Sequence, residues 1–294
     1  MRCVIIIRQS GNSVYAVSYT HLLPDLTKDA TDRNRTSPFA FTGNKFEFRM
    51  VGSKDSIAAP NIVLNTIVAE AFAEASDVLE KAEDFDLAVH DLIKKYLTEH
   101  QRIVFNGNGY SDAWVEEAER RGLPNIKSMV DAIPALTTDK AIGLFEKFHV
   151  FTKAELESRA EIQYETYAKA INIEAKAMID IASKQIIPAV IKYTKSLADT
   201  VNSVTAAGAE ASVQSELLAE TSGLLSDTKV ALQKLMDLDK KSEEVPEGTE
   251  LAHYFHEEIV PAMAELRAPV DALEMIVDKE MWPMPSYGCL LYTS

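Results

Sequence analysis

A continuous stripe of apolar or small residues between positions 156 and 204 constrains the fold of this chain more than any other feature. The stripe residues recur at steps of three and four, which is the spacing that places side chains on one face of an α-helix. An unbroken helix over 152–205 would be about 80 Å long at 1.5 Å per residue. Pro188 should kink it, because proline removes one backbone donor and crowds the preceding turn.

Two further amphipathic segments follow the first. We expect a second long helix over 209–241, then a polar loop, then a third helix over 249–281 that bends at Pro261 or Pro269. Three amphipathic helices joined by short turns favour an antiparallel bundle. The expected inward-facing residues are Val213, Leu217, Leu224, Ala231, Leu235 and Leu238 in the second helix, and Leu251, Phe255, Ile259, Met263, Leu266, Val270, Leu273 and Val277 in the third.

The chain before the bundle has shorter helical patterns. We expect a deeply buried helix over 61–81 with Pro60 in its first turn, and a second helix over 84–101. Ser111 should cap a third helix that ends at Gly122, with Pro124 two residues later. Gly122 to Pro124 is also the expected domain boundary. Thr138 should open a short helix through 148, and the capping box at 152–155 should start the long one.

A charged stretch, DRNRTSPFAFTGNKFEFR, runs over 32–49 and turns back on itself at 42–44. Alternation at a period of two should place Lys45, Glu47 and Arg49 on one face of a strand. A carboxylate between two cations suits a divalent metal with phosphate oxygens, because carboxylates bind hard cations and Arg and Lys bind phosphate. The alternative is an edge strand with a solvated, charge-paired face.

Two weaker motifs are open to simpler interpretations. The G-x-G in 103–110 lacks a third glycine and a strand–helix unit of the right length, so we interpret it as a turn. His253, His256 and Glu257 have a ligand-like helical spacing, but no further convergent group is evident, and a solvated face is the better interpretation. Tyr164, Tyr167 and Tyr193 fit a core or a partner surface better than a stacking platform.

Composition narrows the class of protein. The net charge of −15 argues against nucleic-acid and anionic-membrane partners, since both need a basic face. No apolar run approaches the ~20 residues that a membrane span needs. Cys3 and Cys289 are the two cysteines of the chain, which excludes a disulfide framework and a zinc spacing, and a reducing cytoplasm is the expected location.

The stretch over 32–49, together with GNKFEFRMVGSKDSIAAPNIVLNTIVAEA, resembles the late catalytic-domain motif of glutamine synthetases, specifically the long type III enzymes. The family pattern runs N-R-S-x-S, then R-x-E-x-R, then a loop ending in proline before a helix. The resemblance covers approximately 23–288. It implies a mainly α fold, in which the end of a catalytic domain with a few β-strands (23–122) precedes a helical carboxy-terminal domain (123–288).

The resemblance also implies roles for individual residues. Arg35 matches the arginine near the transferred phosphoryl group, and Lys45 stands where an arginine usually reaches the nucleotide phosphates. Glu47 matches a metal-binding glutamate and Arg49 the arginine that holds the substrate glutamate. Ala40 departs from the pattern, because many members have a second arginine there.

The implied activity is an ATP-dependent glutamate–ammonia ligase that uses Mg²⁺ or Mn²⁺, forms γ-glutamyl phosphate and assembles as a homo-oligomeric ring. The family's amino-terminal β-grasp domain and most of its metal-binding glutamates would lie upstream, so we expect an inactive carboxy-terminal fragment. Residues 1–22 and 289–294 are expected to be non-native sequence. The alternative is a non-catalytic helical scaffold or assembly module whose working part is the bundle.

Overall fold

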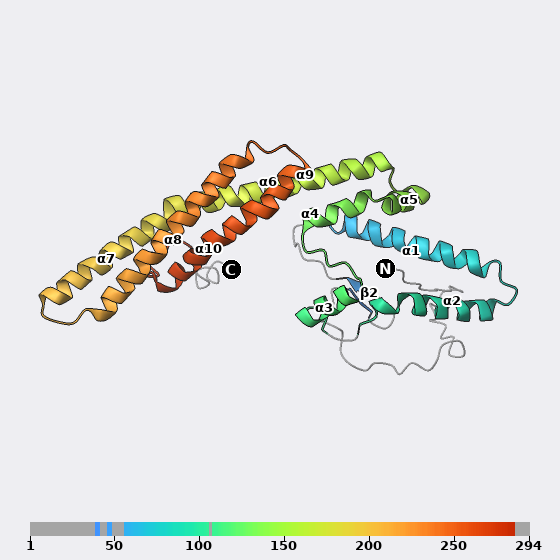
Figure 1. Cartoon of the computed structure of the whole chain (residues 1–294), viewed down its shortest axis with the longest axis horizontal. Helices are drawn as coiled ribbons and strands as arrows, with labels where there is room; N and C mark the ends of the chain where they lie inside the picture. The colour runs from blue at the N-terminus through green and yellow to red at the C-terminus, as the bar shows by residue number, and fades with distance from the viewer. Residues whose placement is uncertain (1–38, 42–45, 49–55, 106–107, 286–294) are drawn as a thin grey trace, which may run out of the picture. The chain divides into compact units, whose positions relative to one another are not determined.

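The computed structural model describes residues 39–41, 46–48, 56–105 and 108–285. The chain divides into two compact units (Figure 1). Unit 1 consists of Met1–Lys127 and Thr138–Lys153, and unit 2 of Ser128–Thr137 and Ala154–Ser294. A ten-residue segment of unit 2 therefore interrupts the sequence of unit 1. The domain boundary after Gly122 stays a prediction.

Unit 1 contains two short strands and four α-helices in its described part. Strands β1 (Phe39–Phe41) and β2 (Phe46–Phe48) pair antiparallel. The helices are α1 (Ala58–Leu79), α2 (Phe85–His100), α3 (Asp112–Arg120) and α5 (Asp139–Lys147), and the 3-10 turn η1 (Gln101–Ile103) extends α2. Helix α5 is fastened to α1 by an ion pair of 2.6 Å between Lys147 Nζ and Glu70 Oε2.

Polar side chains and a glycine set the helix ends of unit 1 where the sequence predicts them. The side chains of Asp84, Ser111 and Thr138 accept hydrogen bonds from the backbone N–H groups that open α2, α3 and α5. Gly122 has φ +66° and closes α3, with the Leu123 N–H donating to the Ala118 carbonyl at 2.9 Å. The predicted caps at Ser111 and Gly122 and the predicted helix start at Thr138 are confirmed.

Helix α1 is less buried than its sequence predicts. Its fully buried residues are Thr66, Ala71 and Ala75, whereas Phe72 and Val78 are exposed. In α2, Leu92 is buried but Leu87 is exposed. Helices α2 and α5 contact α1 but leave Phe72 and Val78 exposed, so the prediction that α1 is deeply buried is wrong for this structure.

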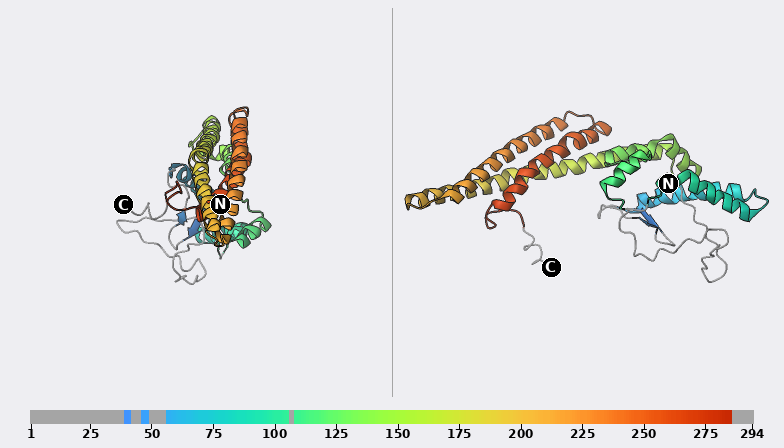
Figure 2. Two further views of the ribbon diagram at one scale, coloured as in Figure 1. Left: turned by 90° about the vertical axis from the view of Figure 1, so that its left-hand side faces the viewer. Right: turned by 60° about the horizontal axis from the view of Figure 1, so that its bottom comes forward.

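Unit 2 is a bundle of long helices (Figures 1 and 2). Helix α6 (Lys153–Ile181) continues through η3 (Ala182–Ile186) into α7 (Ile187–Ala206). Helix α8 (Ser212–Ser242) runs back along α7, and α9 (Thr249–Tyr254), η4 (Phe255–Ile259) and α10 (Val260–Ile276) return along α8. A short piece, α4 (Met129–Ala132) with η2 (Ile133–Thr137), also belongs to this unit.

Two prolines of the bundle follow directly on π-helical turns, whereas Pro269 lies inside α10. Pro188 lies in the first turn of α7 directly after η3, and Pro261 lies in the first turn of α10 directly after η4. In these turns the N–H of Ile187 donates to the Ala182 carbonyl, and that of Val260 to the Phe255 carbonyl. The wider turn removes the clash that a proline ring makes in an α-helix with the carbonyl four residues earlier. The kink expected at Pro188 and the bend expected at Pro261 or Pro269 stay predictions.

The bundle core repeats every seven residues. Ala168, Ala175 and Ala182 on α6 and η3 pack in one cluster with Leu232 and Leu235 on α8 and with η4 and α10 residues. The buried positions of α8 that keep this period are Thr221, Thr228, Leu235 and Ser242, and those of η4 and α10 are Ile259, Leu266 and Leu273. A sustained period of seven is typical of helices that pack as a left-handed supercoil. Most of the predicted stripe is confirmed, but Val213 is exposed because α8 begins only one residue earlier.

The mainly helical fold is confirmed. The described residues contain two strands of three residues each, which is too little to identify the end of a catalytic domain. The catalytic-domain part of the predicted fold therefore stays a prediction. In the described residues, no helix has both the length and the apolarity needed to cross a membrane.

Candidate functional site

The β1–β2 hairpin carries the one predicted site residue that the structure places. Glu47 lies in β2, and its Cα is paired with that of Ala40 in β1. Ala40 is the position where the resemblance leads one to expect a second arginine. Arg35, Lys45 and Arg49 lie outside the described residues. The structure therefore tests neither the grouping of these four residues nor their roles.

Helix α3 carries a tight cluster of charges beside the G-x-G segment. The Glu117 carboxylate accepts hydrogen bonds from Arg120 at 2.7 and 2.6 Å and from Arg121 Nε at 2.5 Å. These two guanidinium groups lower the pKa of Glu117 to about 2. The carboxylate is therefore ionised at all physiological pH values and is fully engaged by its two partners.

Arg121 also fixes the chain that precedes α3. Its Nη1 donates to the carbonyls of Arg102 and Val104 at 3.2 and 2.8 Å. Its guanidinium lies 5.6 Å from the ring centroid of Trp114, which stacks on Phe105 at 4.1 Å. This cluster holds η1 and the following residues against α3, which is a structural role.

The described part of the G-x-G segment forms a turn. The Tyr110 N–H donates to Asn108 Oδ1 at 3.0 Å, and the Ser111 N–H donates to the Asn108 carbonyl at 3.2 Å. Residues 106 and 107 lie outside the described part of the chain. The described geometry agrees with the interpretation of this motif as a turn.

The histidines of α9 and η4 have separate partners. His253 Nδ1 lies 3.4 Å from Glu257 Oε1, whereas His256 Nδ1 lies 3.2 Å from the hydroxyl of Tyr167 on α6. Within residues 39–41, 46–48, 56–105 and 108–285, no group of three His, Cys, Asp or Glu residues has the arrangement of a metal site. Tyr164 is a core residue of the bundle, packed with Val130, Ile133, Ala160 and Ala252.

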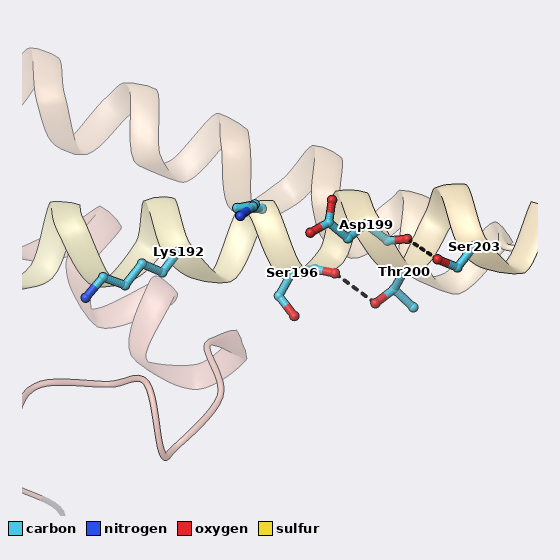
Figure 3. A pocket seen from close by; sticks show the side chains of 6 residues that line it. Lys192, Ser196, Asp199, Thr200 and Ser203 are labelled. Atoms are coloured by element: carbon cyan, nitrogen blue, oxygen red, sulfur yellow. Dashed lines mark hydrogen bonds between the residues drawn. The ribbon is translucent and has the colours of Figure 1, made fainter.

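A polar hollow of about 430 Å³ lies against α7 (Figure 3). Its described lining comes from one helix face: Lys192, Lys195, Ser196, Asp199, Thr200 and Ser203. The hydroxyls of Thr200 and Ser203 donate to the carbonyls of Ser196 and Asp199, one turn earlier, at 2.8 Å each. Because those hydroxyl protons are engaged and the lining contains both lysines and the Asp199 carboxylate, the hollow has no arrangement that singles out one ligand.

Two of these arrangements were missed by the sequence reasoning. The Glu117 cluster has a local signal in the sequence. A glutamate can contact arginines that follow it three and four residues later on a helix, because residues at those spacings lie on the same face. The contact between Tyr167 and His256 joins residues 89 positions apart, and helical periodicity carries no information about such a pair.

Together, the fold and the described residues define a helical protein in which a charged hairpin and short helices precede a long-helix bundle. Comparisons with known proteins identify the region more closely. Residues 88–205 match the family model described as "Glutamine synthetase C-terminal domain". The chain is thus homologous to the carboxy-terminal region of glutamine synthetase.

Individual relatives give the same result over a longer stretch. The type-3 glutamine synthetase of Dictyostelium discoideum is 41% identical over 278 residues, which cover 92% of this chain and 38% of that protein. The glutamine synthetase of Butyrivibrio fibrisolvens is 36% identical over 91% of this chain and 39% of its own length. That of Bacteroides fragilis (strain YCH46) is 33% identical over 92% of this chain and 38% of its own. The chain therefore spans well under half the length of these relatives.

Proposed function

We propose that this chain supplies the carboxy-terminal part of a type III glutamine synthetase, an ATP-dependent ligase that joins ammonia to glutamate through γ-glutamyl phosphate. The observation that carries the proposal is the 41% identity to a type-3 glutamine synthetase over 92% of the chain. A similarity of that extent includes both the region before the bundle and the bundle itself. The natural location for such an enzyme is the cytoplasm.

The proposed site is the charged stretch over 32–49. Arg35 would neutralise charge on the transferred phosphoryl group, and Lys45 would bind the nucleotide phosphates. Glu47 would bind Mg²⁺ or Mn²⁺ through its carboxylate, and Arg49 would pair with a carboxylate of the substrate glutamate. Phosphoryl transfer depends mainly on positioning and charge neutralisation, which are the contributions that these residue types make.

One glutamate is not a metal site. Hard divalent cations take six or more oxygen ligands, and the described residues hold no group of three acids or histidines that could supply them. The other ligands would come from parts of the synthetase that this chain, at 38% of its relative's length, does not contain. The isolated chain should therefore be inactive. We also propose that the working enzyme is a homo-oligomeric ring that binds glutamate, ammonia and ATP.

A chimera tests the proposed function directly. Residues 23–288 of this chain would replace the matching region of the Dictyostelium type-3 glutamine synthetase, and glutamine formation from glutamate, ammonia and ATP would be measured. A soluble chimera with ligase activity supports the proposal. A soluble, correctly assembled chimera without activity contradicts it, provided that the same domain exchange with the Bacteroides fragilis region is active.

The isolated chain provides a second test. Purified chain assayed for γ-glutamyl transfer with Mn²⁺ should show no turnover above buffer. Measurable turnover that is lost on chelation would contradict the statement that the chain lacks part of the site.

The competing scaffold function has less support. The stripes of α6, α8 and α10 pack against one another in one core, so they are not available to a second subunit. An assembly surface would have to use other residues, such as Ile173 on α6, which is 70% exposed. Native mass spectrometry of the full chain tests the scaffold function. A monomer argues against it, whereas a stable oligomer of the inactive isolated chain would show that the chain can assemble without the rest of the enzyme.

A further inference from the structure

The turn before α3 places an asparagine directly before a glycine. Asn108 and Gly109 are the described half of the sequence NGNG over 106–109. Asn108 is exposed, so water reaches its side chain. Gly109 has no Cβ, and its backbone nitrogen is therefore open to atoms of the preceding side chain. These two facts favour a covalent reaction within the chain itself.

Hydrogen bonds to both of its oxygens hold Asn108 in the turn. The Tyr110 N–H donates to Asn108 Oδ1 at 3.0 Å. The N–H and the hydroxyl of Ser111 donate to the Asn108 carbonyl at 3.2 and 2.8 Å. The ring closed by the first of these bonds contains both Asn108 Cγ and the Gly109 nitrogen, so the side-chain amide stays folded over the following peptide bond. The Tyr110 N–H also stabilises negative charge that develops on Oδ1.

From these contacts we propose that Asn108 is a site of spontaneous deamidation. The Gly109 backbone nitrogen loses its proton to hydroxide and attacks Asn108 Cγ, which places negative charge on Oδ1 beside the Tyr110 N–H. The side-chain nitrogen then takes up a proton and leaves as ammonia, and a cyclic succinimide remains. Water opens the succinimide at either carbonyl and gives aspartate or isoaspartate. Water is consumed and ammonia is released, and nothing is oxidised or reduced.

The two products affect α3 differently. Aspartate keeps the length of the main chain, and its carboxylate still accepts from the Tyr110 N–H. Isoaspartate adds a methylene group to the main chain, and the carbonyl that Ser111 binds becomes part of a side-chain carboxylate. Ser111 is the N-cap of α3, and its hydroxyl accepts from the Trp114 N–H at 3.4 Å. Isoaspartate at 108 therefore loosens the first turn of α3. This inference does not depend on the proposed ligase activity.

Peptide mass spectrometry of the full chain, incubated at mildly alkaline pH, tests the reaction. The mass gain that accompanies the change from amide to acid is assigned to each asparagine by fragmentation, so Asn106 is scored separately. Asn125 is the internal control, because it is also exposed and outside regular secondary structure but precedes Ile126, whose branched Cβ hinders the attack. Asn108 should convert at least about tenfold faster than Asn125, and Gly109→Ala should slow it at least about fivefold. Equal rates at the two asparagines, or an unchanged rate in Gly109→Ala, would overturn the proposal.

The contribution of the turn is tested against the unfolded chain. The rate at Asn108 in the folded chain should equal or exceed the rate in guanidinium chloride at the same pH and temperature, because the turn keeps Cγ and the Gly109 nitrogen together. A folded rate more than about tenfold slower would show that the turn protects Asn108 and would overturn the proposal.

Hydrogen exchange tests the effect on α3. The chain that contains isoaspartate at 108 is separated from the unmodified chain and compared with the Asn108→Asp variant, which has the same charge but an unchanged main chain. Exchange in 112–116 should be faster in the isoaspartate chain. Equal exchange in the two proteins would overturn the effect on α3.

Discussion

The hydroxyl of Tyr167 on α6 lies 3.2 Å from Nδ1 of His256 in η4, and the two rings meet edge to face at 6.3 Å. The contact joins the first and third long helical segments at the π-turn that precedes Pro261. Burial, followed by the charges of Glu174 and Asp131, raises the pKa of Tyr167, so the phenol stays protonated. Which of the two groups donates depends on the tautomer of His256. This pair is a polar connection within a mostly apolar core.

Replacing Tyr167 by Phe should therefore lower the stability of the bundle. The substitution keeps the ring and removes one hydrogen bond, which contributes about 0.5–1.5 kcal/mol to the free energy of unfolding. Urea denaturation followed by circular dichroism measures the change. Tyr110→Phe is the control, because Tyr110 is 58% exposed, and it should leave the midpoint unchanged. Equal effects of the two variants would show that the hydrogen bond between Tyr167 and His256 adds nothing to the free energy of unfolding.

Two buried threonines of α8 should respond differently to valine. Thr228 donates to the Leu224 carbonyl at 2.8 Å, whereas Thr221 Oγ1 has no hydrogen-bond partner among the described residues. Both are 0% exposed. A buried hydroxyl without a partner costs about 1–3 kcal/mol. Thr221→Val should therefore raise the free energy of unfolding by about 1 kcal/mol relative to Thr228→Val. Urea denaturation of both variants measures it, and the opposite order would contradict the structure.

Two glycines form a matched pair for alanine substitution. Gly122 has φ +66°, where an L-residue is strained, so Gly122→Ala should destabilise the chain by about 1–2 kcal/mol. Gly143 lies inside α5, and apart from its chain neighbours and the helix's own nearby backbone, no described atom lies within 4 Å of the place where a Cβ would stand. Gly143→Ala should stabilise by about 0.5–1 kcal/mol. Thermal unfolding distinguishes them, and a loss of stability at both positions would contradict the assignment of α5.

Glu117 should remain ionised in acid. Its two arginine partners lower its pKa from 4.5 to about 2 in the folded chain. A folded-state pKa below the unfolded value means that the stabilisation is complete above pH ~4.5 and is lost as the pH falls towards 2. Carbon-detected NMR titration of the Glu117 carboxyl group measures its pKa. A midpoint at the ordinary glutamate pKa of 4.5 would show that the arginines do not hold the carboxylate in solution.

The sequence predicts the bundle well because helical periodicity is a local signal that packing then satisfies. Leu235, Ile259 and Leu266 lie in the predicted stripes and are buried. The caps at Ser111 and Thr138 follow from local hydrogen bonding in the same way. Periodicity does not show whether another element packs on an apolar helix face, and for this reason the deep burial predicted for α1 is wrong.

The interruption of unit 1 by 128–137 could not be predicted either. Val130 and Ile133 lie in a short apolar run without periodicity, and their partners on α6 and α9 are at least 27 residues away in the sequence. The candidate site was found from residue types and their resemblance to a family. Of the four predicted site residues, the structure places only the backbone of Glu47. Which residues make up the site therefore stays a prediction.

We propose above all that the stretch over 32–49 forms one wall of a ligase site, in which Glu47 binds the metal. The most direct test is the Mn²⁺ dependence of γ-glutamyl transfer in the active chimera with Glu47→Gln, compared with Asp91→Asn on the exposed face of α2. We predict that Glu47→Gln raises the Mn²⁺ concentration for half-maximal rate at least about tenfold, while Asp91→Asn leaves it unchanged. An unchanged Mn²⁺ dependence and rate in the Glu47→Gln chimera would contradict the assignment.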